Sequence, residues 1–210
     1  MAYAAALVEE IRSRRDEILI SSEINTLYFG GGTPSVLPLC AFQDVVAALD
    51  DIFGDSGTHH SYDEFTVEVN PEDVVSEGLE YLKALKELGV NRISMGIQSF
   101  DDGILKWMNR RHSVLQARQA YELLVEAGFD NISIDLIFGL SHLDDKTWSD
   151  TIEQALSWDK VTHVSAYQLS VEPDSSLDRL VQRGLYKEAS QEQCARQYEL
   201  LCQRLSAAGY

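Results

Sequence analysis

Glycine and polar residues follow the β-rich runs of this chain, at strand ends where α/β proteins bind ligands. The clearest run, Thr26 to Phe29, opens directly into Gly30-Gly31-Gly32-Thr33-Pro34. Three glycines remove side chains from a strand end, so backbone N–H and C=O groups can approach a ligand closely. A tight turn that needs positive φ is the structural alternative. The run is not a P-loop, because no Gly-Lys-Ser/Thr follows, and Pro34 interrupts any GxGxxG pattern.

Two carboxylates, Glu68 and Asp135, lie on the polar side of otherwise apolar strands. Burying a carboxylate is costly unless it is paired or hydrogen-bonded. Either these acids accept hydrogen bonds from ribose hydroxyls or an ammonium group of a ligand, or they pair internally with Arg92. Gln98 ends a third strand and could serve a similar ligand as a neutral donor and acceptor.

Two arginines, Arg110 and Arg111, follow the third strand. A planar guanidinium suits carboxylate binding. One arginine is therefore a candidate for a substrate carboxylate, and the other is interpreted as a surface charge. His112 is expected to be a polar surface residue. His59 and His60 sit in a polar loop without the acid or cysteine spacing of a metal site.

The three cysteines form no recognisable framework. Cys194 and Cys202 lie on one predicted helix, and a spacing of eight residues puts them about 12 Å apart along its axis, too far for a disulfide. Cys40 is isolated, and the chain has no CxxC or CxxxCxxC motif. We expect reduced thiols in a cytosolic protein and no metal ligands within the chain.

The order of local patterns predicts an α/β fold. After a helix at 3–19, strands are expected at 24–29, 64–69, 91–97, 130–137 and 162–169, with helices at 40–53, 73–88, 113–127, 146–157 and 190–208. Strands that alternate with helices indicate a parallel sheet, whose ligands gather at the carboxyl ends of the strands. Gly89, Gly128 and Gly209 stand where helix-ending glycines belong.

The strands are apolar on one face only. The second strand shows this in Phe65, Val67 and Val69 on one side and Thr66, Glu68 and Asn70 on the other. A sheet covered by helices on both faces would be apolar on both, and a closed eight-stranded barrel is filled by branched aliphatic side chains. We therefore expect an incomplete or widened α/β barrel whose polar interior holds a large ligand.

Composition limits the class of protein. The 210 residues suit one α/β domain, and 45% hydrophobic with 24% charged residues is ordinary for a soluble protein. No apolar run approaches the roughly 20 residues of a membrane span, and the start lacks the features of a signal peptide. The net charge of −17 argues against nucleic-acid and anionic-membrane partners.

Five segments together resemble a known family. They occur in the order Tyr28 to Ser35 (YFGGGTPS), Glu68 to Pro71 (EVNP), Arg92 to Phe100 (RISMGIQSF), Asn109 to His112 (NRRH) and Ile134 to Leu140 (IDLIFGL). This arrangement resembles the radical S-adenosylmethionine (SAM) proteins of the oxygen-independent coproporphyrinogen III oxidase group. The resemblance covers essentially the whole chain.

The resemblance implies a fold and a set of cofactors. The fold is a partial (β/α)6 barrel. The cofactors are a 4Fe-4S cluster on a CxxxCxxC loop and S-adenosylmethionine, which the cluster cleaves to a 5′-deoxyadenosyl radical. By resemblance, Gly31, Gly32 and Thr33 meet the methionine end of S-adenosylmethionine, and Glu68 meets another part of it. In the oxidase, a second S-adenosylmethionine or substrate region is lined by positions that match Gln98, Arg110, Asp135 and Ser170 of this chain.

The chain also departs from the family, because the cysteine loop is absent. We expect residues 1–210 to be the barrel core of a longer protein, without the first strand, the cluster loop and a C-terminal domain. The chain alone should hold no cluster and generate no radical.

Within the group, Gln98-Ser99-Phe100 and Arg110-Arg111-His112 resemble the heme-chaperone branch. The expected function is then a cytoplasmic protein that binds heme and passes it to an acceptor protein. The alternative is an oxidase that decarboxylates coproporphyrinogen III. A third reading, an unrelated α/β-barrel enzyme, would use Glu68 and Asp135 as acid and base.

Overall fold

A computed structural model describes residues 2–18, 24–53 and 60–210. The expected end of the first helix at residue 19, His59 and much of the polar loop at 54–63 lie outside the described residues. The elements are α1 Ala2–Ser13, α2 Arg15–Ile18, β1 Thr26–Phe29, η1 Pro34–Val36, α3 Leu39–Phe53, β2 Glu64–Val69, α4 Pro71–Glu87, β3 Arg92–Gln98, α5 Asp102–Trp107, α6 Val114–Glu126, β4 Ile132–Phe138, α7 Asp145–Leu156, β5 Val161–Gln168, α8 Ser176–Gln182 and α9 Gln191–Ala207.

The described strands form a five-stranded sheet in the order β1-β2-β3-β4-β5. β1 pairs with β2 in parallel from Thr26 opposite Glu64, and β4 pairs with β5 in parallel, ending with Phe138 opposite Gln168. Strands consecutive in sequence are therefore neighbours in the sheet, as expected when a helix covers each crossover. The α/β fold expected from the sequence is confirmed, with β1 and β5 as the edge strands of this sheet.

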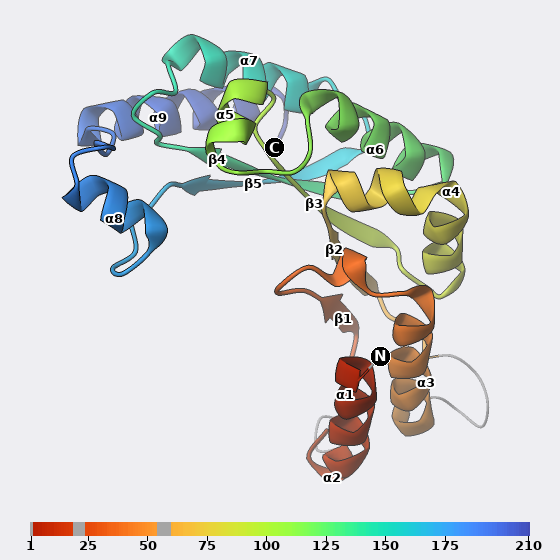
Figure 1. Cartoon of the computed structure of the whole chain (residues 1–210). Helices are drawn as coiled ribbons and strands as arrows, with labels where there is room; N and C mark the ends of the chain where they lie inside the picture. Colours follow the sequence, from red (N-terminus) through yellow and green to blue (C-terminus); the bar gives the residue numbers. More distant parts are fainter. Residues whose placement is uncertain (1, 19–23, 54–59) are drawn as a thin grey trace. The chain divides into compact units, whose positions relative to one another are not determined.

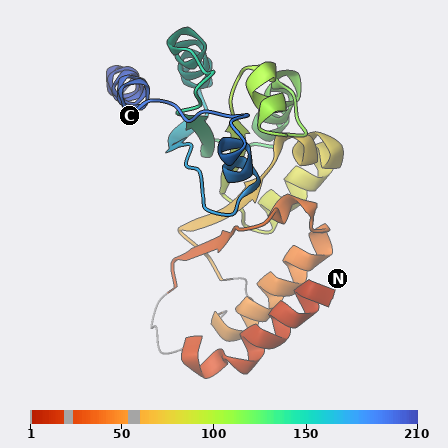
Figure 2. The ribbon, with the colours of Figure 1, turned by 60° about the vertical axis from the view of Figure 1, so that its left-hand side comes forward.

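The chain divides into two compact units. The first consists of Met1–Ser94 and Gln119–Asn131. Within it, α1 packs alongside α3, as both ribbon views show (Figure 1, Figure 2). The ring of Phe29 lies 5.0 Å from that of Phe42 and 5.5 Å from that of Phe65. This aromatic contact ties β1, α3 and β2 into one apolar core.

The second unit consists of Met95–Arg118 and Ile132–Tyr210. Within it, α7 and α9 lie side by side over the β4 and β5 pair (Figure 1). Trp148 of α7 is fully buried, and its ring stacks on Phe138 at the end of β4, with centroids 5.6 Å apart. None of the helices in the described residues combines the length and apolar character needed to cross a bilayer.

The apolar strand face predicted from the sequence is confirmed. Its residues in β2 and β3 are at most 4% exposed: Phe65, Val67, Val69, Ile93, Met95 and Ile97. The small residues on the opposite side are buried too, namely Thr66, Ser94 and Ser133. The longer polar side chains of Glu68 and Asp135 are only half-buried.

Two helices differ from the prediction. The first is interrupted at Arg14, which separates α1 from α2. α4 begins at Pro71, two residues earlier than expected, and contains Gly78 with a φ of 75°. Proline is favoured at the first position of a helix, because its missing N–H would be unbonded there anyway.

Besides η1, two short helices were not predicted. The side chain of Asp101 accepts from Ile104 N and starts α5, and that of Ser175 accepts from Asp178 N and starts α8. Aspartate and serine are preferred at helix N-caps, so these two residues were the available signals. Both helices lack the long apolar periodicity on which the sequence reading relied.

A buried glutamine joins three segments of the second unit. Gln197 of α9 is fully buried, and its Oε1 accepts from Gly139 N at 2.9 Å. Its Nε2 donates to Leu143 O at 2.8 Å, and its backbone oxygen accepts from Trp148 Nε1 at 2.9 Å. The turn after β4 is thus fixed to α9 and α7 by hydrogen bonds that water does not replace.

Replacing Gln197 by leucine tests this connection. The change keeps the volume of the side chain but leaves the buried Gly139 N–H without its acceptor, at a cost of roughly 1–3 kcal/mol. Denaturant unfolding of the 210-residue chain should show that loss. The matched Gln203→Leu change, at an exposed position of the same helix, should alter the free energy of unfolding by less than about 0.5 kcal/mol. Equal effects of the two changes would contradict a structural role for the Gln197 side chain.

Candidate functional site

The glycine run and Glu68 meet directly in the first unit. Glu68 Oε2 accepts from Gly31 N at 2.8 Å, and Glu68 Oε1 accepts from the Tyr28 hydroxyl at 2.7 Å. The carboxylate at the end of β2 therefore holds the loop that follows β1. Arg92 forms an ion pair with Glu64 at 3.5 Å. The carboxylate of Glu68 contacts Gly31 and Tyr28 instead of forming the salt bridge to Arg92 that the sequence allowed.

The three glycines are required for two different reasons. Gly31 and Gly32 have φ values of 78° and 65°, which side chains other than glycine rarely adopt. A Cβ on either would meet no atom within 4 Å, so the space beside this backbone is open. A Cβ on Gly30 would instead collide with the Tyr28 ring and lie 2.9 Å from Glu68 Oε1. Positive φ thus accounts for Gly31 and Gly32, and the close approach of Tyr28 and Glu68 accounts for Gly30, while contact with a ligand stays a prediction.

Further hydrogen bonds fix the rest of this loop. Ser35 Oγ donates to Asp73 Oδ2 at 2.7 Å and accepts from Asn70 N at 3.3 Å. Thr33, a predicted site residue, is half-buried at the start of η1 and makes no side-chain capping bond there. Sequence reasoning missed Tyr28, Ser35 and Asp73. The only signal was their position beside the glycine run and the end of β2.

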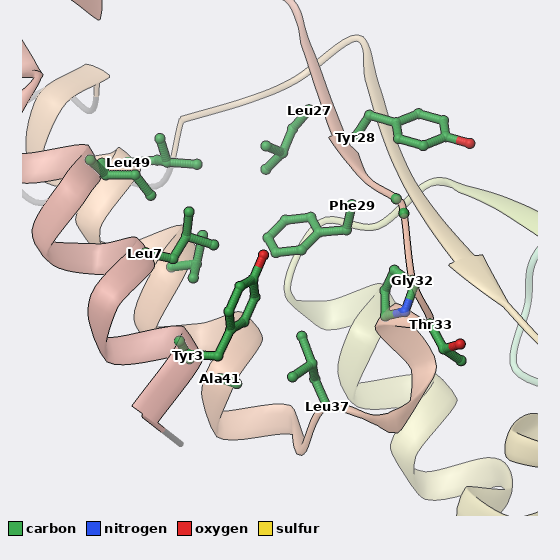
Figure 3. Close-up of a pocket in the computed structure, with 16 residues that line it drawn as sticks. Tyr3, Leu7, Leu27, Tyr28, Phe29, Gly32, Thr33, Leu37, Ala41 and Leu49 are labelled. Atoms are coloured by element: carbon green, nitrogen blue, oxygen red, sulfur yellow. The ribbon is translucent and has the colours of Figure 1, made fainter.

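An apolar cavity of about 690 Å³ lies beside the glycine run. It is lined by residues of α1, β1 and α3, and Gly31, Gly32 and Thr33 also line it. Figure 3 shows Phe29 pointing into it, whereas Tyr28 points to the opposite side of the strand. Most of the residues that line the cavity are apolar, so it suits apolar side chains or an apolar group.

In the second unit, Gln98 has strained backbone geometry. It ends β3 with a φ of 69°, and its side chain is 8% exposed. The carbonyl oxygen of Ile97 accepts from Ser99 N at 2.9 Å and lies 3.1 Å from a ring nitrogen of His112. His112 is 5% exposed, so the expectation of a surface histidine was wrong. A buried non-glycine residue held at positive φ often marks a functional site.

The other predicted residues of this unit occupy different environments. Asp135 is half-buried on β4, opposite Ser165 of β5. Arg110 is exposed, and its backbone N–H donates to Leu105 O at 2.9 Å. Ser170 is exposed after β5, and its Oγ donates to Glu172 Oε1 at 2.8 Å. The structure thus puts Gln98 and Asp135 on strands and the other two in solvent-facing loops.

The cysteines do not form a cluster site. Cys40 and Cys202 are exposed, Cys194 is buried, and all three are free thiols. Among the described residues, no group of three or more His, Cys, Asp or Glu side chains could hold a metal ion. His60 is engaged otherwise, because one of its ring nitrogens lies 2.8 Å from Ile24 O. These three cysteines therefore do not supply the ligand set of an iron–sulfur cluster.

With the fold and these contacts in view, the class of the protein is clear. Residues 3–155 match the Radical SAM superfamily. The chain belongs to this superfamily, as its five sequence segments suggested.

Particular relatives are similar over much of the chain. The heme chaperone HemW of Bacillus subtilis is 37% identical over 89% of this chain and 48% of its own length. An oxygen-independent coproporphyrinogen III oxidase of Paracoccus denitrificans is 30% identical over 76% of this chain and 34% of its own length. The solved structure of the coproporphyrinogen III oxidase HemN from Escherichia coli is similar in fold, with a TM-score of 0.81 at 24% identity. The alignment covers the whole of this chain and 46% of the HemN chain. The chain spans about half the length of the chaperone that it matches.

The Glu68 contacts generate a prediction for the 210-residue chain. Glu68→Gln leaves one acceptor oxygen where Gly31 N and the Tyr28 hydroxyl both donate. The Gly31 amide should exchange with deuterium roughly tenfold faster, which corresponds to about 1.4 kcal/mol of lost protection. Exchange measured by NMR checks this. The exposed Glu87→Gln change serves as the control, and an unchanged rate at Gly31 in Glu68→Gln would refute the bracing role.

Proposed function

We propose that the full-length protein is a radical SAM heme chaperone, which binds S-adenosylmethionine, a 4Fe-4S cluster and heme and passes heme to an acceptor protein in the cytoplasm. The observation that carries this proposal is the 37% identity to a named heme chaperone over 89% of the chain. The identity to a named oxidase is lower and covers less of the chain. The free thiols agree with a reducing compartment.

The glycine run is suited to bind S-adenosylmethionine in this proposal. Gly31 and Gly32 expose backbone beside open space, so the polar end of a cofactor could approach their amide groups. Glu68 lies next to them and carries a charge that suits an ammonium group or hydroxyls. S-adenosylmethionine, when bound, supplies the sulfonium whose cleavage gives a radical. The protein residues orient it and hold the loop in place.

Gln98, Arg110, Asp135 and Ser170 complete the proposed cofactor and substrate lining. Support comes from the strained backbone of Gln98 and the half-buried carboxylate of Asp135. The exposed guanidinium of Arg110 suits a carboxylate, such as a porphyrin propionate.

We propose that the cluster ligands lie outside these 210 residues, because the three cysteines do not fit them. A further strand beside β1 would agree with two features of the first unit. β1 is an edge strand, whose free N–H and C=O groups can pair with another strand. The apolar cavity beside β1 would receive the side chains of that strand. The proposed C-terminal domain would likewise lie in the half of the relatives' length that this chain does not span.

The second candidate function is an oxygen-independent coproporphyrinogen III oxidase, which the Paracoccus denitrificans relative favours. One residue argues for the chaperone. Ser99 stands where the oxidase, by resemblance, carries an acid. It is 2% exposed, and its Oγ accepts from Asp101 N at 3.2 Å, so it acts as a local turn residue.

The two functions separate in one experiment on the full-length protein, reconstituted with its cluster under anaerobic conditions. It should bind heme and yet leave coproporphyrinogen III unconverted when S-adenosylmethionine and a reductant are supplied. Decarboxylation requires a propionate held a few ångströms from the radical, and small misplacements are costly in rate. Protoporphyrinogen formation and heme binding are measured on the same sample. Catalytic turnover to the divinyl product would overturn the chaperone assignment.

Glu68→Gln in the same protein should weaken S-adenosylmethionine binding by roughly 1–3 kcal/mol, the scale of one charge-assisted hydrogen bond. Isothermal calorimetry measures the affinity, and Glu87→Gln controls for the loss of a surface charge. An unchanged affinity would restrict Glu68 to its contacts with Tyr28 and Gly31.

A further inference from the structure

The end of β3 is a strained turn centred on Gln98. Ser99 N donates to Ile97 O at 2.9 Å, and Gln98 between them has a φ of 69°. A three-residue turn of this hand is the rare, strained form of the γ-turn, which persists only where the surrounding structure imposes it. The Gln98 side chain is 8% exposed, and its amide has no hydrogen-bond partner among the described residues. Such an amide is suited to receive a polar ligand.

His112 supplies a second hydrogen bond to the same turn. Its Nε2 lies 3.1 Å from Ile97 O. Because a carbonyl oxygen only accepts, Nε2 carries the proton and donates. The oxygen belongs to the rigid peptide plane that joins Ile97 to Gln98, and the orientation of that plane is coupled to the φ of Gln98. The imidazole and Ser99 N therefore hold the strained turn together.

The backbone that carries the imidazole is fixed on both sides. His112 is 5% exposed. Before it, Arg110 N donates to Leu105 O of α5 at 2.9 Å. After it, Val114 N donates to Asp102 Oδ1, at the start of the same helix, at 2.8 Å. The segment with His112 is thus anchored to α5 and can act as a support for the end of β3.

We propose that His112 is a positioning residue, which holds Gln98 in the strained turn and fixes it relative to Arg110. Arg110 lies two residues before His112 on the same anchored segment. The inference rests on the proposed function, in which Gln98 and Arg110 line the cofactor and substrate region. It adds that His112 arranges this part of the lining before a ligand arrives, by acting through Ile97 O.

Amide exchange of the 210-residue chain, followed by NMR, tests the link between His112 and the turn. His112→Leu removes the donor to Ile97 O, so the Ser99 amide should exchange with deuterium roughly tenfold faster. His112→Gln should restore protection, because its side-chain nitrogen can donate to the same oxygen. The control Leu201→Ala, a buried change in α9, should accelerate Ser99 no more than the core amides of β4.

Glycine at position 98 separates relief of strain from simple packing. Glycine adopts positive φ readily, so the turn in Gln98→Gly should no longer require the imidazole. Adding His112→Leu to Gln98→Gly should then leave the Ser99 amide protected. If His112 only fills space, its replacement will expose Ser99 equally with glutamine or glycine at position 98. That result would overturn the proposal.

The effect on a ligand is measured in the full-length protein, reconstituted with its cluster, with S-adenosylmethionine as the probe. Apparent affinity falls with the fraction of molecules that hold the competent turn, so His112→Leu should weaken binding by roughly tenfold in calorimetry. His112→Gln should bind nearly as tightly as the unchanged protein, and Leu201→Ala should bind equally tightly.

The outcomes distinguish the role of His112 from the function on which it rests. Unchanged affinity in His112→Leu, together with weaker binding in Glu68→Gln, would overturn the positioning role and leave the proposed function standing. If the unchanged protein binds no S-adenosylmethionine, the proposed function fails, and the positioning role fails with it.

Discussion

The loops of the candidate site depend on residues with positive φ, which turn the backbone sharply at the ends of the strands. The backbone turns left-handed at Gly31 and Gly32 after β1, at Gln98 where β3 ends, and at Gly139 after β4, with φ values between 65° and 79°. Such a turn leaves the sheet at once, so the following residues stay at the strand end. Without these turns, the strands would continue past the positions where a ligand of a parallel sheet is bound.

The turns after β1 and β4 are each held by a polar side chain from another segment, and these two side chains differ in burial. Gln197 is fully buried and fixes the turn after β4 as part of the core. Glu68 is half-buried and fixes the turn after β1 at the border of open space. A fully buried amide is costly to move, whereas a carboxylate near solvent can exchange its partner for a ligand. The glycine run is therefore held in place by hydrogen bonds and remains exposed.

The superfamily match covers most but not all of the chain. The Radical SAM match spans residues 3–155, a range that includes the glycine run and β1 to β4. Tyr186 lies outside this range, and its ring centroid is 5.0 Å from that of Trp107 at the end of α5. The chain spans about half the length of its chaperone relative. The handling of heme by the full-length protein is therefore a proposal.

The sequence by itself determined the alternation of strands and helices, the apolar strand face and the superfamily, because periodicity and local motifs are recorded within short windows. It also singled out Gly31 and Glu68, since glycines and a carboxylate are conspicuous at strand ends. Only the tertiary structure decided that these two bind each other, that His112 is buried, and that Trp107 meets His142 and Tyr186. The physical reason is that such contacts join residues tens of positions apart. Their formation depends on how the chain folds back on itself, and no local pattern encodes that.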